Sequence, residues 1–117
     1  MPNPICHFEI MVPDPEKARA FYGQVFDWSY REDPTHDYIV IHTGADPNGG
    51  IMRTPPGVPV AASLNVYVRV DDIDATLKRV EAAGGHVIVS KTDIPGIGAF
   101  ALFSDPDGVA LGIFREV

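Results

Sequence analysis

Two stretches of the chain alternate between apolar and polar residues, a pattern that predicts β-strands with one face turned towards a core. In the first stretch the two faces are Phe8, Ile10 and Val12 against His7, Glu9 and Met11. In the second they are Val66, Val68 and Val70 against Asn65, Tyr67 and Arg69. We expect the apolar faces to pack against helices, which leaves the mixed faces to line a binding site or to face solvent.

Each of these strands leads into a segment with helical periodicity. Asp14 and Asp72 suit the N-cap position, because a carboxylate accepts hydrogen bonds from the first backbone N–H groups of a helix, and Pro15 suits the first helical position. The apolar positions recur at helical spacing; they are Ala18, Phe21, Tyr22, Val25 and Phe26 in the first helix and Ile73, Leu77, Val80 and Ala83 in the second. Glycines at 84 and 85 predict the end of the second helix.

Three shorter β-like runs follow each helix, separated by turns rich in Asp, Pro and Gly. These runs are 28–31, 38–43 and 50–53 after the first helix, and 86–91, 99–103 and 109–114 after the second. The chain is therefore one strand–helix–three-strand unit written twice, with His7 and Asn65 at corresponding positions. We predict a single domain over 1–117, made of unit one at 4–53, a Pro-rich linker at 54–62 and unit two at 63–116.

The composition narrows the classes of partner and compartment. A formal net charge of −7 argues against nucleic acids and anionic membranes, which both attract basic patches. No apolar run approaches the roughly 20 residues that span a bilayer, and the first residues do not form a secretory signal. Cys6 is the single cysteine, so an internal disulfide is excluded and a reducing, cytoplasmic location is expected.

The mixed strand faces are the best candidates for a binding site. They carry His, Glu, Asn, Tyr and Arg side chains together with Met, and the last strand adds Ala110, Gly112 and Phe114. Small, polar and aromatic residues in combination are typical of the wall of a ligand pocket. The alternative is a sheet face that simply lies in solvent.

The ordered set of motifs resembles a known family. The motifs are Cys6-His7-Phe8-Glu9-Ile10, Asp14-Pro15-Glu16-Lys17-Ala18, Phe21-Tyr22, Ala82-Ala83-Gly84-Gly85 and Asp105-Pro106-Asp107-Gly108. From about residue 4 to residue 116 the chain resembles the vicinal oxygen chelate superfamily of glyoxalases, bleomycin-resistance proteins and extradiol dioxygenases, and within it uncharacterised proteins related to lactoylglutathione lyase. The resemblance implies an α+β fold in which two tandem βαβββ units form a curved mixed sheet around a cleft, with the helices on the outer face.

The resemblance also implies where a divalent metal such as Zn, Ni, Fe or Mn would bind. Members of the family often take one ligand from the first and last strand of each unit, and His7 stands at the first of these positions. Asn65 occupies the second, where an amide is a weak ligand. Gly112 and the stretch from Gly50 to Met52 occupy the other two and offer no carboxylate or imidazole. The resemblance therefore implies a metal position at His7 alone, and we expect no complete metal site.

Two classes of function remain open. The first is a protein that binds a small organic molecule in the cleft without a complete metal site, and the second is a metal-dependent lyase, isomerase or dioxygenase. His7 and Glu9 are the candidate catalytic pair, since a carboxylate beside an imidazole suits acid–base chemistry, although they could equally line a cleft. The candidate ligand-binding residues are Asn65, Tyr67, Arg69, Met52, Gly112 and Phe114. The resemblance further implies a homodimer.

Overall fold

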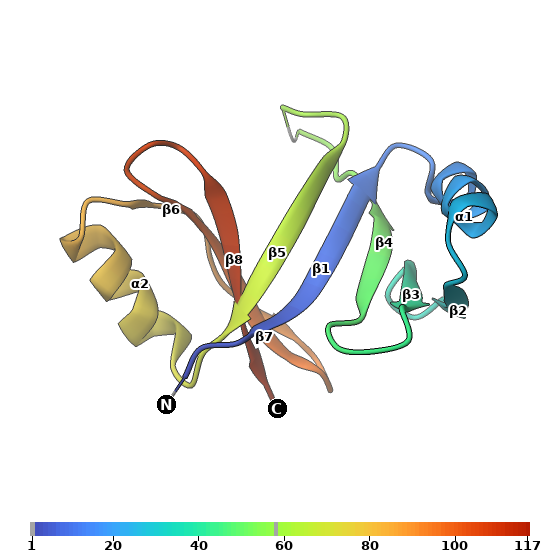
Figure 1. Ribbon diagram of the computed structural model, residues 1–117. Coiled ribbons are helices and arrows are strands. Elements are labelled where there is room, and N and C mark those ends of the chain that lie inside the picture. The colour runs from blue at the N-terminus through green and yellow to red at the C-terminus, as the bar shows by residue number, and fades with distance from the viewer. Residues whose placement is uncertain (1, 58) are drawn as a thin grey trace. The chain divides into compact units, whose positions relative to one another are not determined.

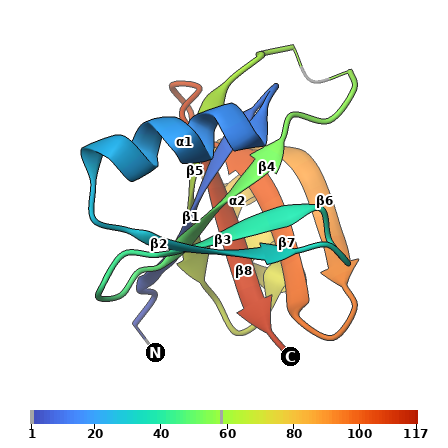
Figure 2. The same cartoon turned by 90° about the vertical axis from the view of Figure 1, so that its right-hand side faces the viewer.

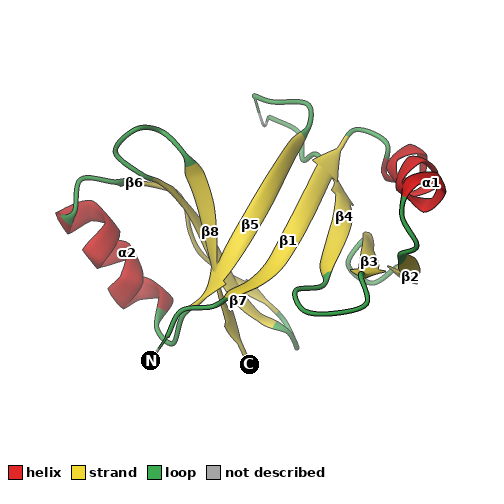
Figure 3. Ribbon diagram, viewed as in Figure 1, coloured by secondary structure: helices red, strands yellow, loops and turns green. Residues whose placement is uncertain are grey.

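The computed structural model describes residues 2–57 and 59–117, so Val58 of the predicted linker lies outside the described residues. The chain divides into two compact units. The N-terminal unit is His7–Asn65, and the C-terminal unit is Val66–Val117 together with the residues up to Cys6. Each unit contains one helix and a set of strands (Figure 1, Figure 3). The α+β class and the two tandem βαβββ units are thereby confirmed.

The N-terminal unit is a four-stranded mixed sheet with one helix. Its elements are β1 (Ile5–Val12), α1 (Pro15–Val25), β2 (Ser29–Asp33), β3 (Tyr38–His42) and β4 (Gly49–Arg53). The strand order is β2-β3-β4-β1, with β1 parallel to β4 and the other pairs antiparallel. The parallel pair is joined by the long α1–β2–β3 connection, as parallel neighbours require.

The C-terminal unit repeats this plan. Its elements are β5 (Ser63–Arg69), α2 (Ile73–Ala82), β6 (His86–Ile94), β7 (Gly98–Ser104) and β8 (Ala110–Glu116). The order is β5-β8-β7-β6, and β5 runs parallel to β8. β6 continues three residues beyond the predicted run, because Thr92–Ile94 still pairs with β7 before the chain turns.

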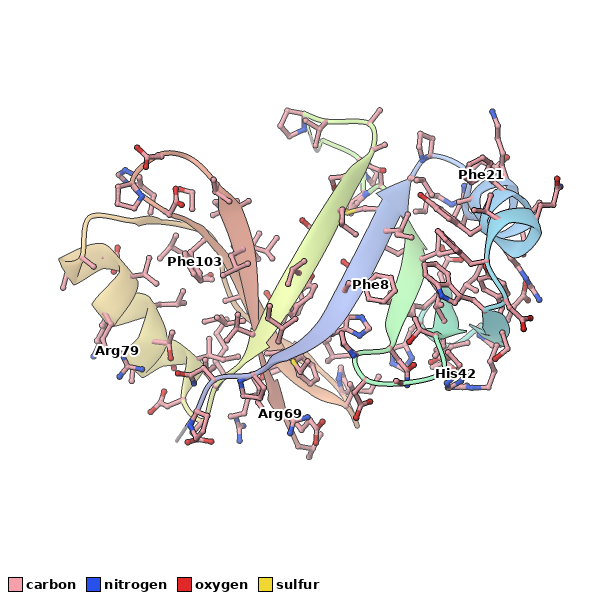
Figure 4. All side chains as sticks on the ribbon, in the orientation of Figure 1. Phe8, Phe21, His42, Arg69, Arg79 and Phe103 are labelled. Carbon is pink, nitrogen blue, oxygen red and sulfur yellow. The ribbon has the colours of Figure 1, made fainter. Side chains whose placement is uncertain are left out.

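Each unit has its own apolar core on the side of its helix. The N-terminal core is Ile10, Ile39, Ile41 and Ile51, and the C-terminal core is Val70, Ile73, Leu77, Ala99, Ala101 and Ile113. Partly buried side chains complete both cores, including Phe8 and Tyr22 in the first and Val68 and Phe103 in the second (Figure 4). The alternation in the sequence therefore predicted correctly which face of each first strand packs inward.

The helix starts follow the sequence closely. The Asp14 carboxylate accepts a hydrogen bond from the Lys17 N–H at 3.3 Å, and the Asp72 carboxylate accepts one from the Ala75 N–H at 3.0 Å. Beyond α2, Gly84 has a φ of +97°, the left-handed conformation that favours glycine at a helix end. Both predicted N-caps and the predicted end of the second helix are confirmed.

The outer part of α1 differs from the expectation. Ala18 and Tyr22 pack against the core, whereas Phe21, Val25 and Phe26 are 59%, 53% and 48% exposed. Figure 2 shows α1 lying across one side of the strands of its unit, so only one stripe of the helix meets the sheet. The apolar side chains cover a larger part of the helix surface than the single stripe that the sheet buries. No helix among the described residues is long and apolar enough to cross a membrane.

Candidate functional site

The candidate site of the N-terminal unit lies on the sheet face opposite α1. β1 turns Phe8 and Ile10 towards the core, so His7 and Glu9 point to the other face. The parallel register sets Glu9 beside Gly50 and Met11 beside Met52, which brings Met52 to the same face. Three residues that the sequence singled out (His7, Glu9 and Met52) are therefore together on one face of one sheet, and each is half-buried.

A third polar side chain, Tyr38 of β3, joins His7 to Glu9. The Tyr38 hydroxyl lies 2.7 Å from His7 Nε2 and donates a hydrogen bond to Glu9 Oε2 at 3.1 Å. The His7 and Tyr38 rings lie nearly parallel, with 25° between their planes. The three side chains thus form a continuous hydrogen-bonded network, which fixes the imidazole relative to the carboxylate.

Gly50 makes this network sterically feasible. Tyr38 on β3 is in register with Met52 on β4, and β4 lies between β3 and β1. The Tyr38 side chain must therefore reach over β4 to meet His7 on β1. Two strand spacings of about 4.8 Å separate β3 from β1, a distance that a tyrosine can cover only by lying flat on the strand between them. A Cβ atom at Gly50 would overlap the Tyr38 ring. Glycine leaves the space that the ring fills.

The hydrogen bonds define the protonation of His7. Burial lowers the pKa of His7 below its ordinary value, which favours the neutral imidazole at neutral pH. An ionised Glu9 can only accept, so the Tyr38 hydroxyl donates to it and offers its oxygen lone pair to His7. His7 Nε2 then carries the hydrogen, and Nδ1 is the accepting atom of the ring. The network can therefore hold one defined tautomer of a neutral base.

Sequence reasoning missed Tyr38. Its alternation within β3 places it on the same face as Val40, but only the register of β3, β4 and β1 reveals that it reaches His7. The one local signal was the pair Gly49-Gly50, because glycines inside a strand often mark a close approach of another group. The other glycine of that pair, Gly49, is also covered, because a Cβ there would overlap the Phe8 ring on the core side.

The C-terminal unit arranges its predicted residues differently. Tyr67 is in register with Gly112, and its ring lies where a Cβ of that glycine would stand. Phe100 meets the Tyr67 ring edge-on, at 6.4 Å between ring centroids. Tyr67 is only 6% exposed, and its ring packs in an aromatic cluster of this unit.

Arg69 and Phe114 are also in register on β5 and β8. The Arg69 guanidinium donates to Glu116 Oε1 at 2.7 Å, and the pair lies in solvent at the end of the strand (Figure 4). Asn65, which belongs to the N-terminal unit, is half-buried on β5. Within the C-terminal unit, Tyr67 and Gly112 pack together while Arg69 is engaged by a carboxylate.

Cys6 lies at the start of β1, in the C-terminal unit. Its thiol donates to the Tyr67 carbonyl oxygen at 3.7 Å, and burial raises the pKa of the thiol. A raised pKa keeps sulfur protonated at neutral pH, which is the opposite of what a nucleophilic cysteine needs.

The positions that the resemblance assigns to a metal do not assemble a donor set within either unit. Gly50 and Gly112 have no side chain, and a tyrosine ring covers each of them. In the described part of the chain, no group of three or more His, Cys, Asp and Glu side chains is arranged to hold a metal ion. His7 and Glu9 are two donors, fewer than a structural or catalytic zinc site uses, so within the N-terminal unit they do not by themselves complete a metal centre.

An apolar groove lies on the opposite, α1 side of the N-terminal unit. Its volume is about 550 Å³. It is lined by Phe8, Ile10, Val12, Tyr22, Trp28, Ala62, Ser63 and Leu64. Trp28 packs against the Tyr22 and Phe26 rings at 6.0 and 4.8 Å between centroids. The polar network and the apolar groove are thus on different faces of the same sheet.

Comparisons with known proteins agree with this architecture. Residues 5–113 match the model of the Glyoxalase/Bleomycin resistance protein/Dioxygenase superfamily. "Putative glyoxylase CFP32" of Mycobacterium tuberculosis is 38% identical over 111 residues, which cover 92% of this chain and 42% of that protein. "Anthracycline biosynthesis protein DnrV" of Streptomyces peucetius is 31% identical over 131 residues, covering 98% and 48%. The chain thus spans less than half the length of these curated relatives.

Solved structures share the fold at low identity. A hypothetical protein from Bacillus halodurans superposes with a TM-score of 0.73 at 12% identity, covering 100% of this chain and 96% of that one. Methylmalonyl-CoA epimerase from Mycobacterium tuberculosis superposes with a TM-score of 0.70 at 14% identity, covering 97% and 87%. At such identities the likeness concerns the fold alone.

Proposed function

Because the chain belongs to the glyoxalase/bleomycin resistance protein/dioxygenase superfamily, we propose that it binds a small organic molecule on the polar sheet face of the N-terminal unit, without a bound metal ion. The observation that carries this proposal is the His7–Tyr38–Glu9 network beside Met52. An apolar thioether next to hydrogen-bonding groups is the usual composition of a ligand site. His7 and Glu9 hold the ligand's polar groups, and Met52 contacts its apolar part.

Charge supports a neutral or cationic ligand. The chain has a net charge of −7, and Glu9 adds an acceptor at the site itself. An anionic ligand would be repelled by the overall field, whereas a ligand with hydroxyl or ammonium donors would be attracted. The relative DnrV is named for anthracycline biosynthesis, and anthracyclines carry phenol and ammonium donors on a fused ring system. An anthracycline is therefore a suitable first probe.

The test is a fluorescence titration of the protein with an anthracycline, compared with S-lactoylglutathione as an anionic competitor. We expect saturable binding of one equivalent with a Kd of order micromolar, about −8 kcal/mol. The substitutions His7→Ala and Met52→Ala should each weaken binding at least about tenfold, or 1.4 kcal/mol. His86→Ala, an exposed histidine of the C-terminal unit, is the matched control. Equal binding by His7→Ala and wild type would overturn the proposal.

Substitutions at the remaining predicted ligand-binding residues are tested in the same anthracycline titration. Asn65, Tyr67, Arg69, Gly112 and Phe114 stay proposed ligand contacts. Arg69 is the most informative of these, because its guanidinium already pairs with Glu116. Arg69→Gln should leave anthracycline affinity unchanged if the ligand is cationic. A loss of affinity would instead indicate that an anionic group of the ligand displaces Glu116.

The alternative function is a metal-dependent lyase, isomerase or dioxygenase. It requires donors that the glycines at 50 and 112 do not supply, which favours the binding function. Elemental analysis of protein purified without chelator distinguishes the two functions. Stoichiometric zinc, nickel, iron or manganese that disappears in His7→Ala would support the enzyme and contradict the metal-free proposal.

We also propose that the chain forms a homodimer. The exposed Phe21, Val25 and Phe26 on α1, with the apolar groove beside them, support a surface that a second copy covers. Sedimentation velocity at micromolar concentration should give the mass of a dimer, and Phe21→Glu should shift it towards the monomer. A monomeric wild type would contradict this proposal.

A further inference from the structure

We propose that Tyr38, held flat over Gly50, is the specificity-determining residue of the candidate site, and that it makes the site select a hydrogen-bonding organic ligand in place of a divalent cation. This inference rests on the proposed binding function and deepens it. It gives a physical reason why a face that carries an imidazole and a carboxylate should not bind a metal.

The hydroxyl of Tyr38 occupies the space between the two donors. It lies 2.7 Å from His7 Nε2 and 3.1 Å from Glu9 Oε2. A zinc ion bridging the same two atoms would have to lie about 2.0–2.2 Å from each of them. The cation and the phenol oxygen therefore compete for one position. Binding a metal there would first require the Tyr38 side chain to leave.

The backbone keeps the ring in that position. Gly50 is buried, in register with Glu9, and has no side chain that could push the ring away. The ring also lies nearly parallel to the His7 imidazole. Displacing the ring would break both hydrogen bonds of the hydroxyl and the contact with the His7 ring. The phenol is therefore a fixed part of this sheet face.

The phenol also changes what the face can offer a ligand. With Tyr38 donating to Glu9, His7 Nε2 donates to the phenol oxygen, and the ring is held in one tautomer. A metal ion would replace these directional bonds by a Lewis acid that binds anionic oxygens. The phenol-bridged face instead presents hydrogen-bonding groups to donors of a neutral or cationic molecule.

The C-terminal unit provides an internal comparison. There the Tyr67 ring covers Gly112 in the same manner, but Tyr67 is almost fully buried and stacks edge-on with Phe100. Because Tyr67 is itself a proposed ligand contact, the control for the loss of a hydroxyl is a tyrosine outside the site. Tyr30 on β2 packs against the helix-side core of the N-terminal unit, so Tyr30→Phe is the matched control for Tyr38→Phe.

The experiment is a calorimetric titration of the full chain with zinc chloride, in the absence of chelator and of any organic ligand. The proteins are wild type, His7→Ala, Tyr38→Phe, Tyr38→Ala, Tyr38→Ala with His7→Ala, and Tyr30→Phe. Tyr38→Phe removes the bridging oxygen and keeps the ring over Gly50, and Tyr38→Ala removes both. We expect both Tyr38 variants to bind zinc at least about tenfold more tightly than wild type, the added His7→Ala to abolish the gain, and Tyr30→Phe to behave as wild type.

Two results would overturn the inference. One is a wild type that binds one equivalent of zinc with an affinity that His7→Ala removes. The other is a zinc affinity that neither Tyr38 variant increases. If circular dichroism shows that Tyr38→Ala does not fold, the comparison of Tyr38→Phe with Tyr30→Phe decides alone. Zinc binding by the wild type would contradict the metal-free binding function as well, whereas an unchanged zinc affinity in both Tyr38 variants would overturn this inference alone. A failure of the anthracycline titration, with zinc affinities as expected, would overturn the proposed ligand and leave this inference standing.

Discussion

In the N-terminal unit, a glycine of β4 lies under a tyrosine ring from β3, whereas in the C-terminal unit a glycine of β8 lies under a tyrosine ring from β5. The first ring comes from a strand that does not pair with β1 and ends in a hydrogen-bonded network with His7 and Glu9. The second comes from the directly paired strand and ends in an aromatic cluster. One backbone plan therefore places the covering ring in a hydrogen-bonded network in one unit and in an aromatic cluster in the other.

The difference between the two units arises from different residues at corresponding positions of the repeat. His7 corresponds to Asn65 and Glu9 to Tyr67 in the repeat, so the polar pair of β1 is replaced by an amide and a ring on β5. The helix-side cores, in contrast, are similar sets of aliphatic residues. The duplication preserved what packs against the helices and varied what faces away from them.

The largest expected effect tests whether the two cores are equivalent. Ile51 and Ile113 are 0% and 2% exposed, each in the core of its own unit. Truncating either to alanine should lower the free energy of unfolding by about 3 kcal/mol, within a range of 2–5, because each leaves a cavity in a close-packed interior. Urea denaturation measures both. A loss below about 1 kcal/mol in one variant alone would mean that the cores are not equivalent.

The next effect concerns the two covered glycines. Gly112→Ala should cost about 1–3 kcal/mol, since the added Cβ overlaps the buried Tyr67 ring, which has little room to move. Gly50→Ala should cost less, because the half-buried Tyr38 ring can swing away. That movement breaks the network, so Gly50→Ala should weaken anthracycline binding.

Gly23→Ala is the control for these glycines. The nearest atom to a Cβ at Gly23 is 3.8 Å away, an ordinary contact, and the residue lies in α1. Alanine should therefore stabilise the helix there by roughly 0.5–1 kcal/mol. If Gly50→Ala retained full ligand affinity while the protein stayed folded, the ring would not depend on that glycine.

A smaller effect compares the helix starts. Asp14→Ala and Asp72→Ala each remove a side-chain acceptor for an N-terminal backbone N–H, and each should cost about 1 kcal/mol. We expect Asp72→Ala to cost slightly more, because its hydrogen bond is shorter, 3.0 Å against 3.3 Å. Thermal unfolding monitored by circular dichroism measures both. Asp93→Ala, at an exposed carboxylate of β6, serves as a surface control.

The smallest effect is a pH dependence confined to the N-terminal unit. Burial lowers the pKa of His7 in the folded chain, so below its ordinary value of 6.5 the unfolded chain binds the proton more readily. The contribution of neutral His7 to the free energy of unfolding is therefore complete above pH 6.5. It is lost as the pH falls from 6.5 towards the lower pKa that His7 has in the folded chain. His7→Gln should flatten this part of the stability profile, and His42→Gln, at an exposed histidine, should not. Parallel profiles for wild type and His7→Gln would contradict the assigned pKa direction.

Much of the fold was accessible from local pattern. The alternation along β1 and β5 predicted which side chains pack inward, and the aspartates at 14 and 72 predicted the helix starts. These features follow from short-range rules, since strand alternation and N-capping involve residues within a few positions of one another. The exposed side of α1 did not follow from them, because how much of a helix a sheet covers depends on how the two pack.

Only part of the candidate site could be predicted from the sequence. His7, Glu9 and Met52 could be selected as polar or sulfur-bearing residues on a strand face, and the structure brings them to one face. Tyr38 could not, because its role depends on reaching over β4, and that requires the register of three strands. Arg69 was a candidate ligand-binding residue, yet in the folded unit its guanidinium pairs with Glu116, which lies far from it along the chain.

The sequence by itself determined the two-copy plan, the helix starts, the inward faces of the first strands and the identity of the imidazole and carboxylate on β1. Each of these is encoded by residue types at fixed local spacing. The tertiary structure decided that a tyrosine ring fills the space above Gly50 and joins His7 to Glu9, and that an equivalent ring above Gly112 joins an aromatic cluster. Strand register and the absence of a single Cβ set those contacts, and both act between residues that only the folded sheet brings together.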